Sequence, residues 1–211
     1  MSNFTDYYYK MKNGSNATIQ HTSSPSEIIK IISKRWRLTI PKSNKEKVEN
    51  PLFVHITSQL EKFSLPIEIK TQSIVSFGRY RGFIFTVCYH PIYTEGKYNI
   101  VLFVNNSMKG TLSLEPLSPS EKAEVSSDND LLNYYKIQSS ALPDRQTLFR
   151  YIDSYTQQIL VDKASDFNVE DKFLFNKNAI AITLSNQTSE ELVDTTMSIL
   201  YNILETIQKI G

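Results

Sequence analysis

The sequence contains one cysteine, Cys88, and only 6 glycines among its 211 residues. A single cysteine excludes a disulfide within the chain, and a zinc site would need three ligands of other types. Scarce glycine argues against loop-rich and repeat architectures. No stretch approaches about 18 consecutive apolar residues, so we predict no membrane span. Residues 1–6 lack the charged start of a signal peptide, and we therefore expect a cytoplasmic protein.

Charge of either sign is moderate overall but unevenly distributed along the chain. Residues 1–110 carry 15 Lys+Arg and 7 Asp+Glu, a formal charge of +8, whereas residues 111–211 carry 8 and 15, a charge of −7. Such asymmetry can mark a basic face for nucleic acid or anionic lipid. It can equally be neutralised within one fold in which the two halves lie side by side.

Helical spacing of apolar residues predicts four helices, and polar residues mark where three of them begin. Ser24-Pro25-Ser26-Glu27 combines an N-cap serine, a first-turn proline and a capping box, and predicts a helix over 24–36. Asn50-Pro51 predicts a helix over 50–63. A third is expected over 144–163. The longest, from Ser189 to the C-terminus, carries a wide apolar stripe with acids in its first turn.

Strands are predicted mainly between residues 67 and 115, where the apolar period changes to two. Further strands are expected over 131–137 and as a hairpin around Asn176-Lys177-Asn178. Because strands cluster rather than alternate with helices, we expect an α+β fold. The predicted architecture is a twisted antiparallel sheet of about 6–8 strands with helices mainly on one face.

Two segments stand out as candidate boundaries. Residues 1–23 are polar without a period and are predicted to be a flexible lead-in to one globular domain over 24–211. Residues 116–130 hold two prolines and several serines and acids. We expect this segment to be a surface loop, although it is also the candidate internal boundary.

Few residues could support catalysis. The sequence has three histidines and none of the common nucleophile, metal or phosphate-binding motifs. Cys88 and His90 are predicted to share one face of a strand, where a thiolate–imidazole pair is conceivable, but catalytic thiolates usually lie at loops or helix N-termini. Asp128-Asn129-Asp130 resembles the start of a calcium loop without its later ligands. We therefore predict no catalytic residues, no metal and no cofactor.

The segment from Phe77 to Phe85 interleaves aromatic residues with Arg79 and Arg81, a mixture that suits stacking on bases and neutralising phosphates. Arg81-Gly82-Phe83-Ile84-Phe85 resembles the RNP1 strand of RNA-recognition motifs. Leu52-Phe53-Val54 resembles a fragment of that family's other aromatic strand. The resemblance implies stacking by Phe53, Phe83 and Phe85, and a backbone contact by Arg81. The alternative is a β-hairpin whose aromatic residues fill the core.

These observations leave several functions open, and we predict a non-enzymatic binding or protein-interaction module. Its partner would be another protein or a second copy of the chain. The candidate binding residues come from two basic–aromatic segments: Lys34, Arg35, Arg37, Arg79, Tyr80 and Arg81.

Two alternatives accompany this prediction. One is single-stranded nucleic-acid binding through Arg79-Tyr80-Arg81. The other is a small-molecule carrier with an apolar pocket between the sheet and the C-terminal helix, a layout that resembles helix-grip proteins. The residues predicted to line that pocket are Phe83, Phe85, Tyr89, Tyr98, Leu102, Met197 and Leu200.

Overall fold

A single antiparallel sheet of seven strands runs through the molecule in the order β1-β2-β3-β7-β6-β4-β5. The computed structural model describes residues 23–62, 69–70, 72–92, 95–104, 111–125, 127, 129–139, 149–185 and 189–210. The strands are β1 (Ile74–Tyr80), β2 (Phe83–Ile92), β3 (Glu95–Phe103), β4 (Leu112–Pro116), β5 (Tyr135–Ser139), β6 (Lys172–Phe175) and β7 (Ala179–Ser185). The predicted α+β class and the predicted strand number are both confirmed.

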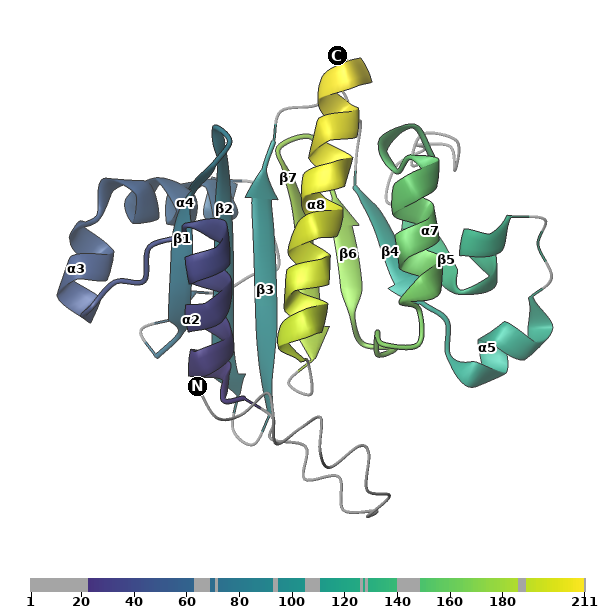
Figure 1. The fold of residues 1–211 in the computed structure, drawn as a ribbon, viewed down its shortest axis with the longest axis horizontal. Helices are drawn as coiled ribbons and strands as arrows, with labels where there is room; N and C mark the ends of the chain where they lie inside the picture. The colour runs from purple at the N-terminus through teal and green to yellow at the C-terminus, as the bar shows by residue number, and fades with distance from the viewer. Residues whose placement is uncertain are drawn as a thin grey trace, which may run out of the picture.

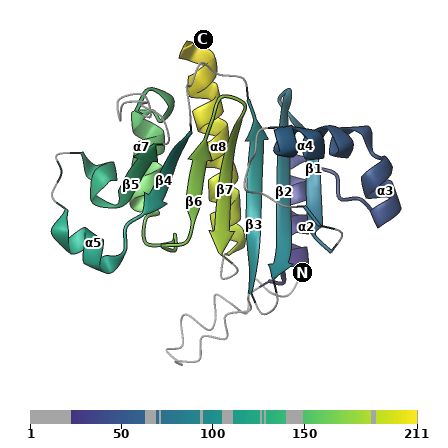
Figure 2. The ribbon, with the colours of Figure 1, turned by 180° about the vertical axis from the view of Figure 1, so that it is seen from behind.

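The helices are α2 (Pro25–Trp36), α3 (Asn44–Glu49), α4 (Pro51–Lys62), α5 (Pro119–Glu124), the 3₁₀ turn η1 (Asp130–Asn133), α7 (Ser154–Asp162) and α8 (Glu190–Ile210). Three of them, α2, α8 and α7, lie side by side on one face of the sheet, with α8 in the middle (Figure 1). On the opposite face α4 covers the β1–β2 end, and no described helix lies over β6, β4 and β5 (Figure 2). This matches the expectation of helices mainly on one face.

The sheet is built from two parts of the chain that meet at its centre. Strands β1, β2 and β3 follow one another as a meander, and β3 then pairs with β7 rather than with β4. Tyr98 faces Leu184 in that central pairing. The first half of the chain therefore forms one end of the sheet and the second half forms the other, as the colours in Figure 1 show.

The main core lies between the sheet and the three helices on its front face. It contains fully buried side chains from β2, β3, β6 and β7 together with the apolar stripe of α8. A smaller core packs Phe53, Ile56 and Leu60 of α4 against Val75 and Phe77 of β1 on the other face. Both apolar stripes were readable from their helical spacing in the sequence.

Local capping chemistry explains why the helices begin where they were expected. Ser24 and Glu27 form the predicted capping box at the start of α2. The Asn50 side chain accepts hydrogen bonds from the backbone of Leu52 and Phe53, which starts α4. Ser189 accepts from the Leu192 backbone at the start of α8. Each side chain satisfies backbone N–H groups that the first helical turn leaves unpaired.

Three sequence-based predictions need correction. The segment expected as a surface loop over 116–130 contains the six-residue helix α5, capped by Ser118. The short helix α3, capped by Ser43, was not expected from the sequence. The strand expected over 131–137 begins only at Tyr135, after η1. The helix expected over 144–163 is interrupted in its described part: residues 149–151 are helical, the chain bends at Ile152, and α7 begins at Ser154, where the Asp153 carboxylate accepts a hydrogen bond from the Thr156 backbone. Residues 140–148 lie outside the described residues, as do 1–22.

Within the described part of the chain, no helix combines the length and the apolar character needed to cross a bilayer.

Candidate binding surfaces

The β1–β2 hairpin places Arg81 against α8. Tyr80 pairs with Phe83, so the turn consists of Arg81 and Gly82, and both have positive φ, 49° and 90°. This is the backbone of the tight hairpin turns that match strand twist. The Arg81 guanidinium lies 5.0 Å from the Tyr201 ring centre and 5.7 Å from that of Tyr80. It also forms an ion pair with Glu205 at 3.5 Å.

Behind this turn lies an aromatic corner, which we define as Trp36, Tyr80, Phe85 and Tyr201. The Trp36 ring centre is 4.9 Å from that of Tyr80 and 5.7 Å from that of Phe85. Tyr80 meets Tyr201 edge-on at 5.7 Å. Such tilted and edge-on contacts are the favoured geometries of aromatic pairs. The aromatic corner therefore joins α2, the hairpin and α8 into one packed unit.

Two of the candidate binding arginines, Arg35 and Arg81, form ion pairs with carboxylates of α8. Arg35 pairs with Asp194 at 2.6 Å and with Glu190 at 3.3 Å, while Arg81 pairs with Glu205. Asp194 also accepts a 2.8 Å hydrogen bond from the Trp36 indole N–H. A nucleic-acid phosphate would have to displace these partners.

The RNA-recognition resemblance does not extend to the fold. Leu52, Phe53 and Val54 lie in helix α4, so the second aromatic strand of that family is missing. Phe85 is fully buried beneath Trp36, and the segment after Tyr89 continues into strand β3 instead of a helix. The alternative, a hairpin with aromatic side chains in the core, describes Phe85 correctly.

The outward side of α2 carries cations that these pairs do not use. Lys30, Lys34 and Arg37 are exposed, and Ile31 between them is 37% exposed. Among the described residues the side chains of Lys34 and Arg37 have no hydrogen-bond or ion-pair partner, and that of Lys30 interacts only at longer range with Glu27. We call Lys30, Ile31, Lys34 and Arg37 the basic surface.

The charge difference between the two halves of the chain is partly neutralised where they meet. Arg35, Arg81 and Lys97 of the first half each pair with carboxylates of the second half, with Glu170 as the partner of Lys97 at 3.8 Å. The basic surface lies outside these pairs. Part of the charge difference is therefore used in ion pairs between the two halves of the chain. The remaining positive charge is exposed on α2.

The residues predicted to line a carrier pocket lie at the sheet–helix interface, as expected from the alternation of β2 and β3. Phe85, Tyr98, Leu102, Met197 and Leu200 are fully buried members of the main core cluster. Phe83 and Tyr89 are half-buried and pack against that cluster. The carrier function remains a prediction, and truncation of Leu200 tests it by measuring how tightly this interface is packed.

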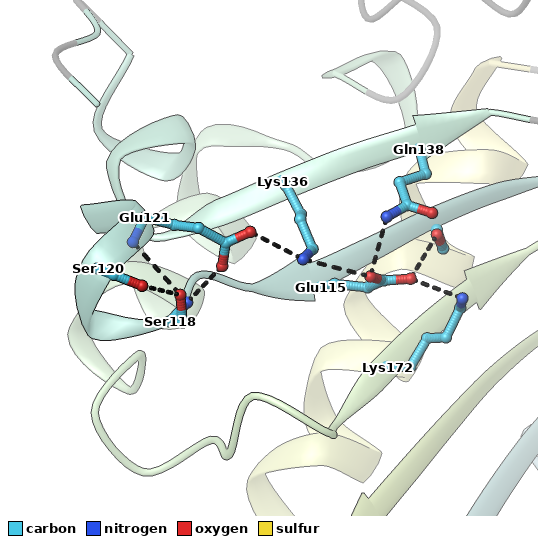
Figure 3. Close-up of polar contacts among 8 residues, drawn as sticks. Glu115, Ser118, Ser120, Glu121, Lys136, Gln138 and Lys172 are labelled. Atoms are coloured by element: carbon cyan, nitrogen blue, oxygen red, sulfur yellow. Dashed lines mark hydrogen bonds and ion pairs between the residues drawn. The ribbon is translucent and has the colours of Figure 1, made fainter. Parts of the chain in front are cut away.

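Figure 3 shows a charged network on the sheet face that no described helix covers. Glu115 of β4 pairs with Lys172 of β6 at 2.6 Å and lies 4.0 Å from Lys136 of β5, which pairs with Glu121 at 3.0 Å. Burial disfavours ionisation of Glu115, but hydrogen bonds from Lys172 and Ser113 outweigh it and lower the pKa of Glu115. These lysines are neutralised, and the network ties α5 to the sheet.

A buried polar cluster surrounds Cys88. The Ser73 hydroxyl lies 3.0 Å from Nδ1 of His90, and the Lys47 ammonium lies 3.5 Å from the carbonyl oxygens of Lys70 and Ser73. Burial raises the pKa of the Cys88 thiol to about 11, although Ser73 and Lys47 act in the opposite direction. A thiol with such a pKa is neutral near pH 7 and is a poor nucleophile.

We therefore expect Cys88 to resist iodoacetamide in the native protein at neutral pH and to react once urea exposes it. Mass spectrometry of the intact chain gives the extent of alkylation in each state. Rapid native alkylation at a rate equal to that of the unfolded chain would contradict this and would reopen thiolate catalysis with His90.

No group of three or more His, Cys, Asp or Glu side chains that could hold a metal ion occurs among the described residues.

Sequence reasoning missed three α8 residues: Tyr201 of the aromatic corner, and the carboxylates Asp194 and Glu205 that contact Trp36 and Arg81. Tyr201 and Glu205 are four residues apart and interact on one side of the helix, as their hydrogen bond shows. That spacing was readable from the sequence. Its proximity to Arg81 was not, because it depends on how α8 packs against α2 and the hairpin.

Comparison with known proteins identifies a similar fold rather than a family. No family model matches the chain, and no curated protein sequence matches it. Among solved structures, the crystal structure of the mycobacterial trehalose monomycolate transport factor A, TtfA, is similar with a TM-score of 0.53 and 11% sequence identity. The match covers 87% of this chain and 94% of the transport factor. At this identity the likeness concerns the fold alone.

Proposed function

We propose that the protein is a non-enzymatic protein-interaction module that binds an acidic surface of its partner through the basic surface on α2. The observation that carries this proposal is the contrast between paired and unpaired cations. Arg35 and Arg81 are engaged with carboxylates of α8, whereas Lys34 and Arg37 have no such partner in the described structure.

The chemistry of the basic surface suits a protein partner better than a bare polyanion. Ile31 is exposed in the middle of the cations and offers an apolar contact as well as charge. Interfaces commonly combine an apolar centre with a polar rim, and complementary charge mainly sets specificity and association rate. The aromatic corner behind α2 fixes this helix in place, which limits the entropy lost on binding.

The test uses a fluorescently labelled acidic peptide that contains glutamates and two leucines. We expect its anisotropy to rise on titration with the protein and the binding to weaken as salt increases, because screening grows with ionic strength. The emission of Trp36, the single tryptophan, reports binding next to α2 in the same titration.

Matched variants separate this surface from general charge. Lys30→Ala/Lys34→Ala should weaken binding by about tenfold or more, since two of the three cations of the basic surface are lost. Lys42→Ala/Lys177→Ala removes the same charge from exposed residues outside α2 and should change binding little. Equal weakening by both pairs, or tighter binding of a single-stranded oligonucleotide than of the peptide, would overturn the proposal.

A further inference from the structure

The three helices on the front face have complementary edges. On one side of α8 lies α2 with the basic surface, and on the other side lies α7 (Figure 1). The exposed residues at the end of α7 and in the following turn include Asp162 and Asp166. Asp166 shares Lys163 with Glu191, and Asp162 accepts from Gln158. The helical face is therefore basic along one flank and has exposed acids on the other.

Each flank also exposes a large apolar side chain. Ile31 on α2 is 37% exposed, and Tyr155 on α7 is 66% exposed. Between them, the outward side of α8 carries the half-buried polar residues Thr195 and Ser198 together with Glu191 and Glu205. Lys163 and Arg81 pair with these two carboxylates, so the middle of the face is polar and largely neutralised.

We propose that the acidic partner of the basic surface is a second copy of this chain, bound face to face about a twofold axis parallel to α8. Such an axis exchanges the two flanks, so α2 of one copy lies over α7 of the other, and this contact occurs twice. Lys30 and Lys34 then meet Asp162 of the second copy, which forms no ion pair in the described structure, and Asp166, which Lys163 of its own copy also contacts. A closed twofold dimer with a self-complementary face is the commonest form of protein assembly.

Other directions of the axis are less favourable. A twofold axis that lies in the plane of the interface but runs perpendicular to α8 would place α2 over α2. It would bring like charges together, which is destabilising. Charge complementarity therefore selects both the partner and the direction of the axis. This inference rests on the proposed function, because it uses the same basic surface.

The test is sedimentation of the full chain over a range of protein concentrations. We expect a monomer–dimer equilibrium that shifts toward monomer as salt increases. Lys30→Glu/Lys34→Glu and, separately, Asp162→Lys/Asp166→Lys should each raise the dimer dissociation constant by at least about tenfold, because each replaces attraction by repulsion. Lys42→Glu/Lys177→Glu makes the same charge change as the first variant outside the helical face and should leave the dimer intact.

Mixing the two reversed variants gives the decisive result. In a mixed dimer one contact joins the native lysines to the native aspartates, and the other joins the introduced glutamates to the introduced lysines. Both contacts are attractive, so the equimolar mixture should recover the dimer. A chain that binds the acidic peptide yet stays monomeric overturns the dimer and leaves the proposed function standing. A dimer that tolerates both reversals, or a mixture that stays monomeric, also overturns it. Loss of peptide binding together with a monomeric chain overturns both proposals.

Discussion

Leu200→Ala is expected to lower the free energy of unfolding by about 2–5 kcal/mol, the usual range for truncating a fully buried leucine. Leu200 is 0% exposed and lies in the core between α8 and the sheet. Alanine is a good helix former, so the loss arises from removed contacts and the cavity rather than from helix propensity. Urea unfolding followed by Trp36 emission gives the change directly.

Asn202→Ala is the matched control for Leu200→Ala, because Asn202 lies on the same helix and is half-exposed. It should change the stability by about 0.5 kcal/mol or less. If Leu200→Ala costs no more than this control, the space between α8 and the sheet is loosely filled. That result would favour the carrier alternative over a solid core.

Asp194→Ala should cost about 1–3 kcal/mol, the penalty for leaving a buried donor without an acceptor. The carboxylate accepts from the Trp36 indole at 2.8 Å and pairs with Arg35 at 2.6 Å. Asp194→Asn keeps an acceptor for the indole and removes the charge, so we expect a smaller loss. Chemical unfolding measures both variants, and the native emission of Trp36 should shift with Asp194→Ala.

Glu205→Ala is the comparison for Asp194→Ala, because Glu205 also lies on α8 and pairs with a cation of the first half of the chain. Glu205 pairs with Arg81 between side chains that are largely exposed, and such pairs contribute at most about 1 kcal/mol. Equal losses from Asp194→Ala and Glu205→Ala would mean that Trp36 does not depend on its carboxylate acceptor. The link between α2 and α8 would then be purely apolar.

Much of the local structure could be predicted because its causes are local. The capping box of Ser24 and Glu27, the Asn50 cap and the apolar stripe of α8 each act within one or two helical turns. The hairpin around Lys177 likewise follows from turn residues between two apolar runs. In each case the residues that decide the structure are neighbours in the sequence.

What could not be predicted depends on contacts between distant segments. Nothing in the sequence of β3 indicates that it pairs with β7 rather than with β4. The same holds for the carboxylates that neutralise Arg35 and Arg81, which lie more than a hundred residues away. As a result the arginines could be named from the sequence as binding candidates, although the structure commits two of them to internal pairs.

The aromatic segment around Phe85 illustrates why composition alone is ambiguous. A strand with aromatic residues along one face suits both base stacking and core packing, and the sequence contains no signal that separates the two. Burial decides the question, since Phe85 and Tyr98 face the helices rather than solvent. Only the position of α2 and α8 over that face determines which reading applies.

The pairing of β3 with β7 has a consequence for how the chain emerges during synthesis. The β1–β3 meander is complete by Phe103, but its central edge finds its partner only when Ala179–Ser185 has been made. Until then the inner edge of β3 has unpaired backbone groups, and such edges promote aggregation of nascent and incomplete chains. Strand β3 thus gains its second partner only when the C-terminal hairpin has been made, so folding of the whole sheet waits for that hairpin.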